Sequence, residues 1–222
     1  MSISRMTRIN WNNYSEKTKK INLQDHEITV LNWEGCPPGL THILLCVNKI
    51  TKINWVGAPR SLKTIHLGCN NITELNWKNC PPGLKIINLS SNRITKLNWN
   101  GVPKGLKHII LGYNCISTLN WENAPPSLET ISLRGNDLTS LNWENCPKGL
   151  KKIVLWDNNL TDFTWDLAPP GLKEVNLSRN QISDFNWEYC PPGLEKIFLN
   201  GIKISDITVT SVPWNIKIIN HG

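Results

Sequence analysis

Apolar and polar residues alternate in a short pattern that recurs along the chain. In the stretch LKIINLSSNRI, which begins at Leu84, apolar residues occupy the first, fourth and sixth places. Ile87 and Leu89 are two residues apart, so both side chains point to the same side of an extended segment. The leucine of the first place returns every 22 residues, at Leu40, Leu62, Leu84, Leu106, Leu128, Leu150, Leu172 and Leu194. The pattern predicts one short strand per unit, and stacked parallel strands would bury their apolar sides together.

The second half of the unit carries tryptophan and proline at fixed places. Written out, the unit is L-x-x-I-x-L-x-x-N-x-I-T-x-L-N-W-x-x-x-P-P-G. Proline lacks a backbone N–H and has a fixed φ, which suits an extended return segment better than a helix. We therefore expect strands on one face, extended or short 3₁₀ segments on the other and little α-helix. About nine units would give a sheet roughly 40 Å long.

Tryptophan repeats with the same spacing as leucine. The series is Trp11, Trp33, Trp55, Trp77, Trp99, Trp121, Trp143, Trp165 and Trp187. Leu75 and Trp77 are two residues apart, so both would face inward in an extended segment. The alternative is an exposed aromatic ladder that binds sugars or choline. We favour the core, because so many exposed indoles would form a patch that soluble monomers rarely tolerate.

Asparagine occupies the ninth place in seven successive units: Asn48, Asn70, Asn92, Asn114, Asn136, Asn158 and Asn180. A buried amide must find hydrogen-bond partners. Its carbonyl oxygen and NH₂ group can pair with backbone groups that lack a strand partner where the chain turns. The series therefore predicts a structural asparagine ladder.

The units continue without a linker or a change of composition. We predict a single domain over residues 1–222, with atypical terminal repeats at about 1–39 and 194–222. The sequence ends part-way through a unit, at IKIINHG. A strand edge there could pair with another chain, so both a monomer and a weak end-to-end dimer are open.

Composition narrows the class of protein. Apolar residues make up 40% of the 222 residues and charged residues 18%, which is not the composition of a disordered chain. No apolar stretch of about 18 residues predicts a transmembrane helix, and the start has no apolar signal region. Cys36, Cys80, Cys146 and Cys190 share a place that other units fill with alanine or valine, so they read as small packed residues. Unpaired cysteines suggest a reducing, cytoplasmic location.

The eleven residues from Leu84 to Ile94 resemble the signature of the leucine-rich repeat family. The resemblance recurs in register over nearly the whole chain. The PPGL junction is further similar to repeats of certain bacterial secreted effectors and of large DNA viruses of amoebae, which adds delivery into a host cell as a second location. The resemblance implies a horseshoe-shaped solenoid with a parallel β-sheet on its concave face. It also implies a non-catalytic scaffold that binds other proteins through that face.

The outward places of each strand are the third, fifth, seventh and eighth, and they vary from unit to unit. Exposed apolar, aromatic and arginine side chains are typical of protein-binding hot spots. Trp156 is the most informative, because it lies outside the regular tryptophan series. The predicted partner-binding residues are Ile86, His108, Ile110, Tyr113, Arg134, Lys152, Val154, Trp156, Arg179 and Phe198. No phosphate loop, zinc-protease motif or nucleophile elbow indicates an enzyme, and no cofactor is expected.

Two alternatives compete with protein binding. The formal net charge is +7, and the second place carries Lys19, Lys63, Lys85, Lys107, Lys151, Lys173 and Lys217. Such a row attracts a polyanion such as nucleic acid or an acidic surface, although its simpler role is solubility. The second alternative is a metal site near Cys46 and His66, with Cys69 and His42 on the same two strands, because histidine and cysteine are zinc ligands.

Overall fold

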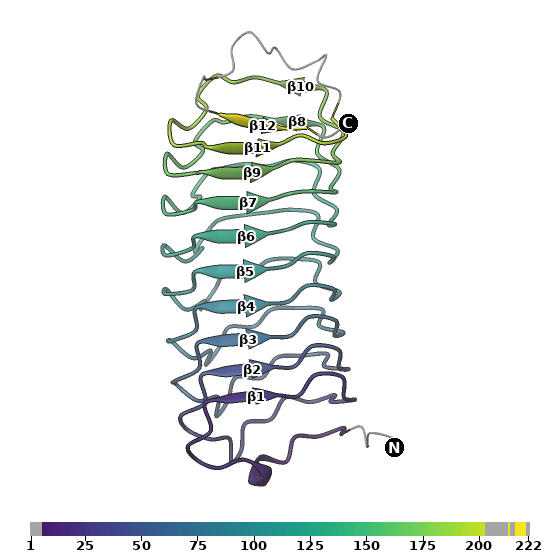
Figure 1. The fold of residues 1–222 in the computed structure, drawn as a ribbon, viewed down its shortest axis with the longest axis vertical. Helices are drawn as coiled ribbons and strands as arrows, with labels where there is room; N and C mark the ends of the chain where they lie inside the picture. The colour runs from purple at the N-terminus through teal and green to yellow at the C-terminus, as the bar shows by residue number, and fades with distance from the viewer. Residues whose placement is uncertain (1–5, 203–212, 214–215, 221–222) are drawn as a thin grey trace.

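The computed structural model describes residues 6–202, 213 and 216–220. Each unit forms one coil that begins with a three-residue strand whose central side chain faces inward. The ten strands of the main sheet are β1 (Lys20–Asn22), β2 (His42–Leu44), β3 (Thr64–His66), β4 (Ile86–Asn88), β5 (His108–Ile110), β6 (Thr130–Ser132), β7 (Lys152–Val154), β9 (Glu174–Asn176), β11 (Lys196–Phe198) and β12 (Lys217–Ile219). They follow chain order in the sheet and stack into one column (Figure 1). The predicted parallel solenoid is confirmed.

The sheet has one strand more than the nine expected. The extra strand is β12, in which Lys217 lies opposite Lys196, only 21 residues earlier. Neither the tryptophan series nor the asparagine series reaches this coil. Pairing needs only backbone groups and an inward apolar residue, which β12 provides with Ile218, so the strand forms without the rest of the repeat pattern. The single domain with atypical terminal repeats stays a prediction.

Opposite the main sheet, the return segments are mostly extended. Two of them form a small second sheet of β8 (Asp162–Phe163) and β10 (Asp184–Phe185), where phenylalanine replaces the usual leucine. The described residues include one 3₁₀ turn, η1 (Trp11–Asn13), and no α-helix. They also contain no helix that is long and apolar enough to cross a membrane. The expectation of extended return segments with little helix is confirmed.

Two residues in most coils adopt a left-handed backbone. One is at the eighth place, where the chain leaves the strand. The other is the second residue after tryptophan, where the chain turns back toward the next strand. In the eighth place φ is 57° at Val47 and 56° at Tyr113, and Gly135 has φ of 60°. For residues with a Cβ this conformation costs about 1–2 kcal/mol, so the neighbouring coils must hold it in place.

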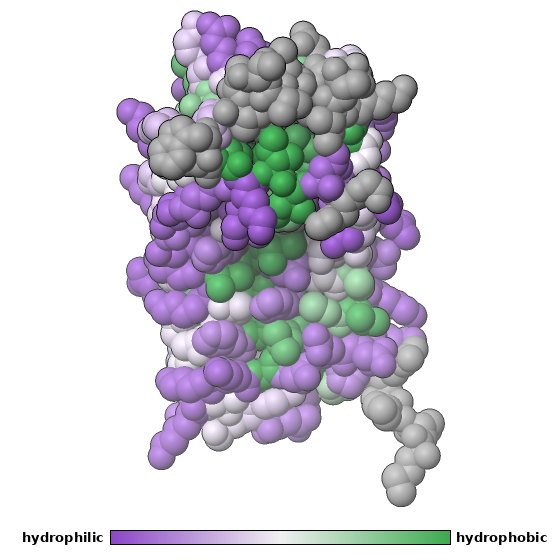
Figure 2. Space-filling view, turned by 45° about the horizontal axis from the view of Figure 1, so that its top comes forward, coloured by the Kyte–Doolittle hydropathy of each residue, from purple (hydrophilic) through white to green (hydrophobic). Residues whose placement is uncertain are grey.

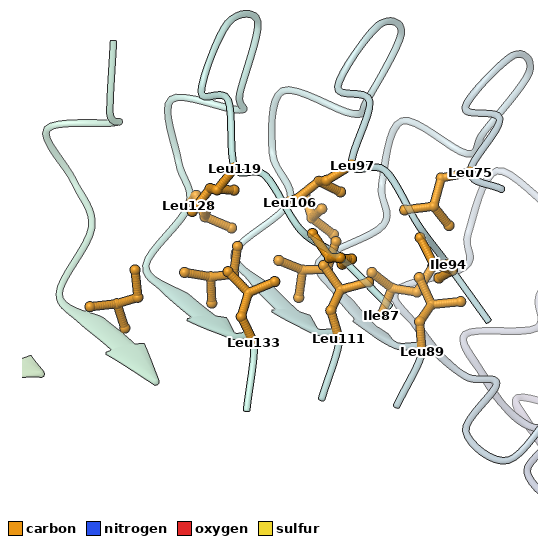
Figure 3. Close-up of a cluster of buried hydrophobic side chains, with 14 of the residues drawn as sticks. Leu75, Ile87, Leu89, Ile94, Leu97, Leu106, Leu111, Leu119, Leu128 and Leu133 are labelled. Carbon is orange, nitrogen blue, oxygen red and sulfur yellow. The ribbon is translucent and has the colours of Figure 1, made fainter. Parts of the chain in front are cut away.

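The tryptophan series lies in the core. Trp99 is only 2% exposed, and its Nε1 donates a hydrogen bond to the carbonyl oxygen of Asn120, 2.8 Å away in the next coil. Trp33 and Trp55 stack with ring centroids 6.5 Å apart. An exposed aromatic ladder is thereby excluded. In Figure 3 the labelled leucine and isoleucine side chains gather between the strands and the return segments, forming the adjacent part of the same core.

The asparagine ladder is also confirmed. Asn92 Nδ2 donates to the carbonyl oxygens of Leu89 and Leu67, each 3.0 Å away, and Asn92 Oδ1 accepts from the N–H of Ile72 at 2.9 Å. One side chain therefore joins its own turn to two points of the preceding coil. Ile202 takes the place of asparagine in the coil of β11 and is buried.

Candidate functional site

The outward side of the main sheet carries two rows of side chains, from the third and fifth places. Six of the predicted binding residues lie in these rows, all half-buried: Ile86, His108, Ile110, Lys152, Val154 and Phe198. The register opposes Ile110 to Ser132 and Ser132 to Val154. Val154 in turn is opposite Asn176, and Asn176 is opposite Phe198. In the view of Figure 2, apolar side chains form a broken band between polar ones.

The register separates two of the predicted apolar residues. Ser132 lies between Ile110 and Val154 in the row. Lys152 already forms an ion pair within the protein, because its Nζ lies 2.6 Å from Glu174 Oε1. The apolar residues of the sheet are therefore interspersed with polar groups.

Four predicted binding residues instead meet at the edge where the strands end. The guanidinium carbon of Arg134 lies 4.6 Å from the ring centroid of Tyr113 and 4.6 Å from that of Trp156. The guanidinium carbon of Arg179 lies 5.0 Å from the Trp156 ring. These are cation–π distances, and they link four successive coils. We call Tyr113, Arg134, Trp156 and Arg179 the arginine–aromatic stack.

Backbone hydrogen bonds between coils hold the stack in place. The N–H of Tyr113 donates to the carbonyl of Arg134 at 2.7 Å, and the N–H of Gly135 donates to that of Trp156 at 2.8 Å. Arg134 Nη2 also donates to the Tyr113 hydroxyl. The rings and the guanidinium groups thus hold each other on a backbone that is itself paired from coil to coil.

Two glycines that are not among the predicted binding residues make room for the stack. A Cβ on Gly112 would lie 2.7 Å from Arg134 Cγ, and a Cβ on Gly135 would lie 2.5 Å from Tyr113 Cδ1. Both distances are shorter than real side chains allow. In the sequence, the two glycines can be recognised only because they stand at outward places where other coils carry side chains.

A shallow pocket adjoins the stack. Arg134, Val154, Trp156 and Asn176 line a cavity of about 260 Å³. Asn176 Oδ1 accepts a hydrogen bond from the backbone N–H of Ser178 at 3.0 Å, which holds the amide against the end of β9. Asn176 is a third residue outside the predicted set, because asparagine at the fifth place of its unit looks ordinary in the sequence.

The lysine row is less basic than expected, because Glu129 and Glu195 occupy the same place in their units. Glu129 pairs with Lys107 at 2.6 Å and with Lys151 at 3.0 Å, and Lys173 pairs with Glu195 at 2.6 Å. Hydrogen bonds from the two lysines lower the pKa of Glu129 from 4.5 to about 2. Three lysines of the row are thus already matched by carboxylates, which weakens the polyanion interpretation.

The residues of the suggested metal site do not assemble into a ligand set. Within the described part of the chain, no three histidine, cysteine or acidic side chains are grouped so that they could hold a metal ion. Cys69 is exposed and Cys46 half-buried, and both are free thiols. Burial lowers the pKa of His66, and the nearby His42 lowers it further. The metal alternative therefore receives no support.

Comparison with known proteins agrees with the fold. A family profile described as "Leucine rich repeat" matches residues 82–138, and a second one with the same description matches residues 170–184. Residues 82–138 and 170–184 thus match the leucine-rich repeat family, and the units outside them keep the same 22-residue period. Proteins of this family are typically non-enzymatic scaffolds for protein–protein interactions, and stacked repeats offer the extended surface that such binding needs. No curated protein sequence matches this chain.

Three solved structures illustrate the likeness of this leucine-rich repeat protein to others. The leucine-rich repeat domain of APL1B has 24% identity and a TM-score of 0.72, over 90% of this chain and 62% of that one. TLR13, in a complex with the RNA ssRNA13, has 25% identity and a TM-score of 0.73, over 84% of this chain and 29% of that one. The Toll–Spätzle complex of Drosophila has 20% identity and a TM-score of 0.74, over 91% and 31%. The chain thus spans less than two thirds of each.

Proposed function

We propose that this leucine-rich repeat protein is a non-catalytic scaffold that binds a partner protein on the outward side of its main sheet. The arginine–aromatic stack would be the energetic centre of that surface. Trp, Tyr and Arg are the residues most enriched in binding hot spots, and here they lie side by side. The observation that carries the proposal is the position of Arg134 between the rings of Tyr113 and Trp156.

The stack is also organised before a partner arrives. Arg134 and Tyr113 restrain each other through a ring contact and a hydrogen bond, so less side-chain freedom remains to be lost on binding. Val154 and Ile110 supply apolar surface near the stack, and Ser132 and Asn176 supply polar groups. This mixture of an anchored centre and a partly polar surround is typical of interfaces between proteins.

Polyanion binding through the lysine row is the less favoured function. Lys107, Lys151 and Lys173 face carboxylates of their own row, so they attract a phosphate chain less than isolated lysines would. The RNA bound by TLR13 is a property of that protein, and no nucleic-acid motif in this chain points the same way.

The test is affinity capture from lysate of the cells that make the protein, followed by measurement of the dissociation constant of any protein recovered. Trp156→Ala and Arg134→Ala should weaken binding roughly thirtyfold or more, as loss of a hot-spot residue does. Tyr189→Ala and Arg60→Ala are matched controls, since both side chains are exposed and lie away from the strand ends. Equal binding by all four variants would contradict the proposal. Capture that disappears after nuclease treatment would favour the polyanion.

A further inference from the structure

The contacts within the stack determine which atoms remain for a partner. The guanidinium carbon of Arg134 lies 4.6 Å from the centroid of the Tyr113 ring and 4.6 Å from that of the Trp156 ring, so two aromatic rings flank this group. Guanidinium N–H groups point outward in the plane of the group. Within the described part of the chain, the only hydrogen bond from this side chain is the one to the Tyr113 hydroxyl. The other N–H groups of Arg134 therefore have no partner among the described residues, and Arg134 is part of the pocket lining.

The second polar group of the pocket is also a donor. The Oδ1 atom of Asn176 already accepts from Ser178, which leaves the Nδ2 amide to donate. Among the residues that the structure describes, no acidic side chain lines the pocket. Among the described residues, neither Arg134 nor Arg179 forms an ion pair, and Asp157, the residue after Trp156, makes none with them. The site thus offers positive charge and N–H donors without a matching anion.

The remaining lining favours a carboxylate on a short apolar stem. Val154 and Trp156 supply apolar surface beside the donors. An aspartate or glutamate side chain combines a methylene group with a planar anion, and arginine binds carboxylates through paired N–H groups. A nucleic-acid base is a poorer fit, because Arg134 and Arg179 already occupy positions over the Trp156 ring on which a base would stack.

We infer that the pocket between Arg134 and Asn176 receives an acidic side chain of the protein partner, whose carboxylate pairs with the in-plane N–H groups of Arg134. This inference rests on the proposed function and specifies the chemistry of the partner. It also assigns a role to Gly112. The missing side chain at Gly112 lets the stem of Arg134 cross the preceding coil and bring its guanidinium between the two rings.

The probe is a random peptide library displayed on phage and selected against the immobilised full chain. Recovered peptides are then synthesised, and their dissociation constants are measured by fluorescence polarisation. Three variants are compared with the wild type: Arg134→Gln, Gly112→Ala and the control Arg60→Gln. Gly112→Ala keeps the charge of Arg134, but its Cβ would collide with Arg134 Cγ and displace the guanidinium. Gly112 does not have a left-handed backbone, so alanine adds no backbone strain there.

We expect the recovered peptides to share one aspartate or glutamate. Its replacement by asparagine or glutamine should weaken binding about tenfold to a hundredfold, the range for a charge-assisted hydrogen bond. Arg134→Gln and Gly112→Ala should weaken binding similarly and remove the preference for the acid, while Arg60→Gln should leave both unchanged.

Two other outcomes would overturn the inference and separate it from the proposed function. Peptides that depend on Trp156 but share no acidic residue would disprove the carboxylate pocket and leave protein binding intact. If no recovered peptide depends on Trp156 or Arg134, or if these residues retain only single-stranded RNA, both proposals fail.

Discussion

Asn114 Nδ2 lies 3.0 Å from the carbonyl oxygen of Leu89, 25 residues earlier in the chain. The same side chain accepts a hydrogen bond from the N–H of Ile94, 2.9 Å away, so one amide serves two turns of the preceding coil. We predict that Asn114→Ala destabilises the protein, because each buried backbone group left unpaired costs about 1–3 kcal/mol. Urea denaturation followed by circular dichroism measures the change. Asn159→Ala, at an exposed asparagine, is the matched control. An unchanged midpoint for Asn114→Ala would show that the ladder is dispensable.

Trp99 and Trp156 allow a core tryptophan to be compared with one at the surface. Trp99 is buried and hydrogen-bonded, whereas Trp156 is half-buried at the edge of the sheet. Trp99→Ala should lower the free energy of unfolding by about 3–5 kcal/mol, the usual cost of removing a large core side chain. Trp156→Ala should cost clearly less and should act mainly on binding. Denaturation curves of the two variants provide the comparison, and wild-type fluorescence should be blue-shifted. Similar losses for both variants would contradict this distinction.

The lowered pKa of Glu129 predicts that the folded protein loses stability at acid pH. The pKa of Glu129 falls to about 2 in the folded protein because Lys107 and Lys151 donate hydrogen bonds to it. A carboxylate with a depressed pKa stabilises the fold fully above its unfolded value of about 4.5, and this contribution is lost as the pH falls toward 2. The stability difference between wild type and Glu129→Gln should therefore shrink between pH 4.5 and 2. Denaturation at several pH values measures it, with Glu144→Gln as the reference variant. A difference that does not change with pH would refute the lysine contacts.

The cysteines should differ in reactivity. Burial raises the pKa of the Cys36, Cys80 and Cys146 thiols to about 12 and that of Cys190 to about 11. The thiolate is the reactive form, so these four should stay largely unmodified by iodoacetamide at pH 8. Cys69 and Cys115 are exposed and should be modified first. Peptide mass spectrometry over time identifies the order, and all seven cysteines should react in denaturant. Equal rates for Cys146 and Cys115 in the folded protein would contradict the packing.

Most of the repeat could be predicted because each of its residues has the same neighbours in every coil. The inward Ile87, the indole of Trp99 and the amide of Asn92 have roles that follow from local spacing and from stacking alone. The arginine–aromatic stack was only partly predictable. Its four members were selected as outward residues, but their mutual contacts depend on which coil each belongs to and on the empty space at Gly112 and Gly135. The place of Glu129 among the lysines is visible in the sequence, whereas its two ion pairs can be identified only from interatomic distances in the structure.

The sequence by itself determined the coil, because one 22-residue unit cannot bury its leucine, tryptophan and asparagine alone, whereas stacked units bury them in every coil. It also determined the family, since the signature recurs in register. Only the tertiary structure decided how the variable residues combine. Tyr113, Arg134, Trp156 and Arg179 are as much as 66 residues apart in the chain and meet because the strands stack in register. Periodic positions follow from local spacing, whereas contacts between unique side chains depend on the register and space that the assembled coils provide.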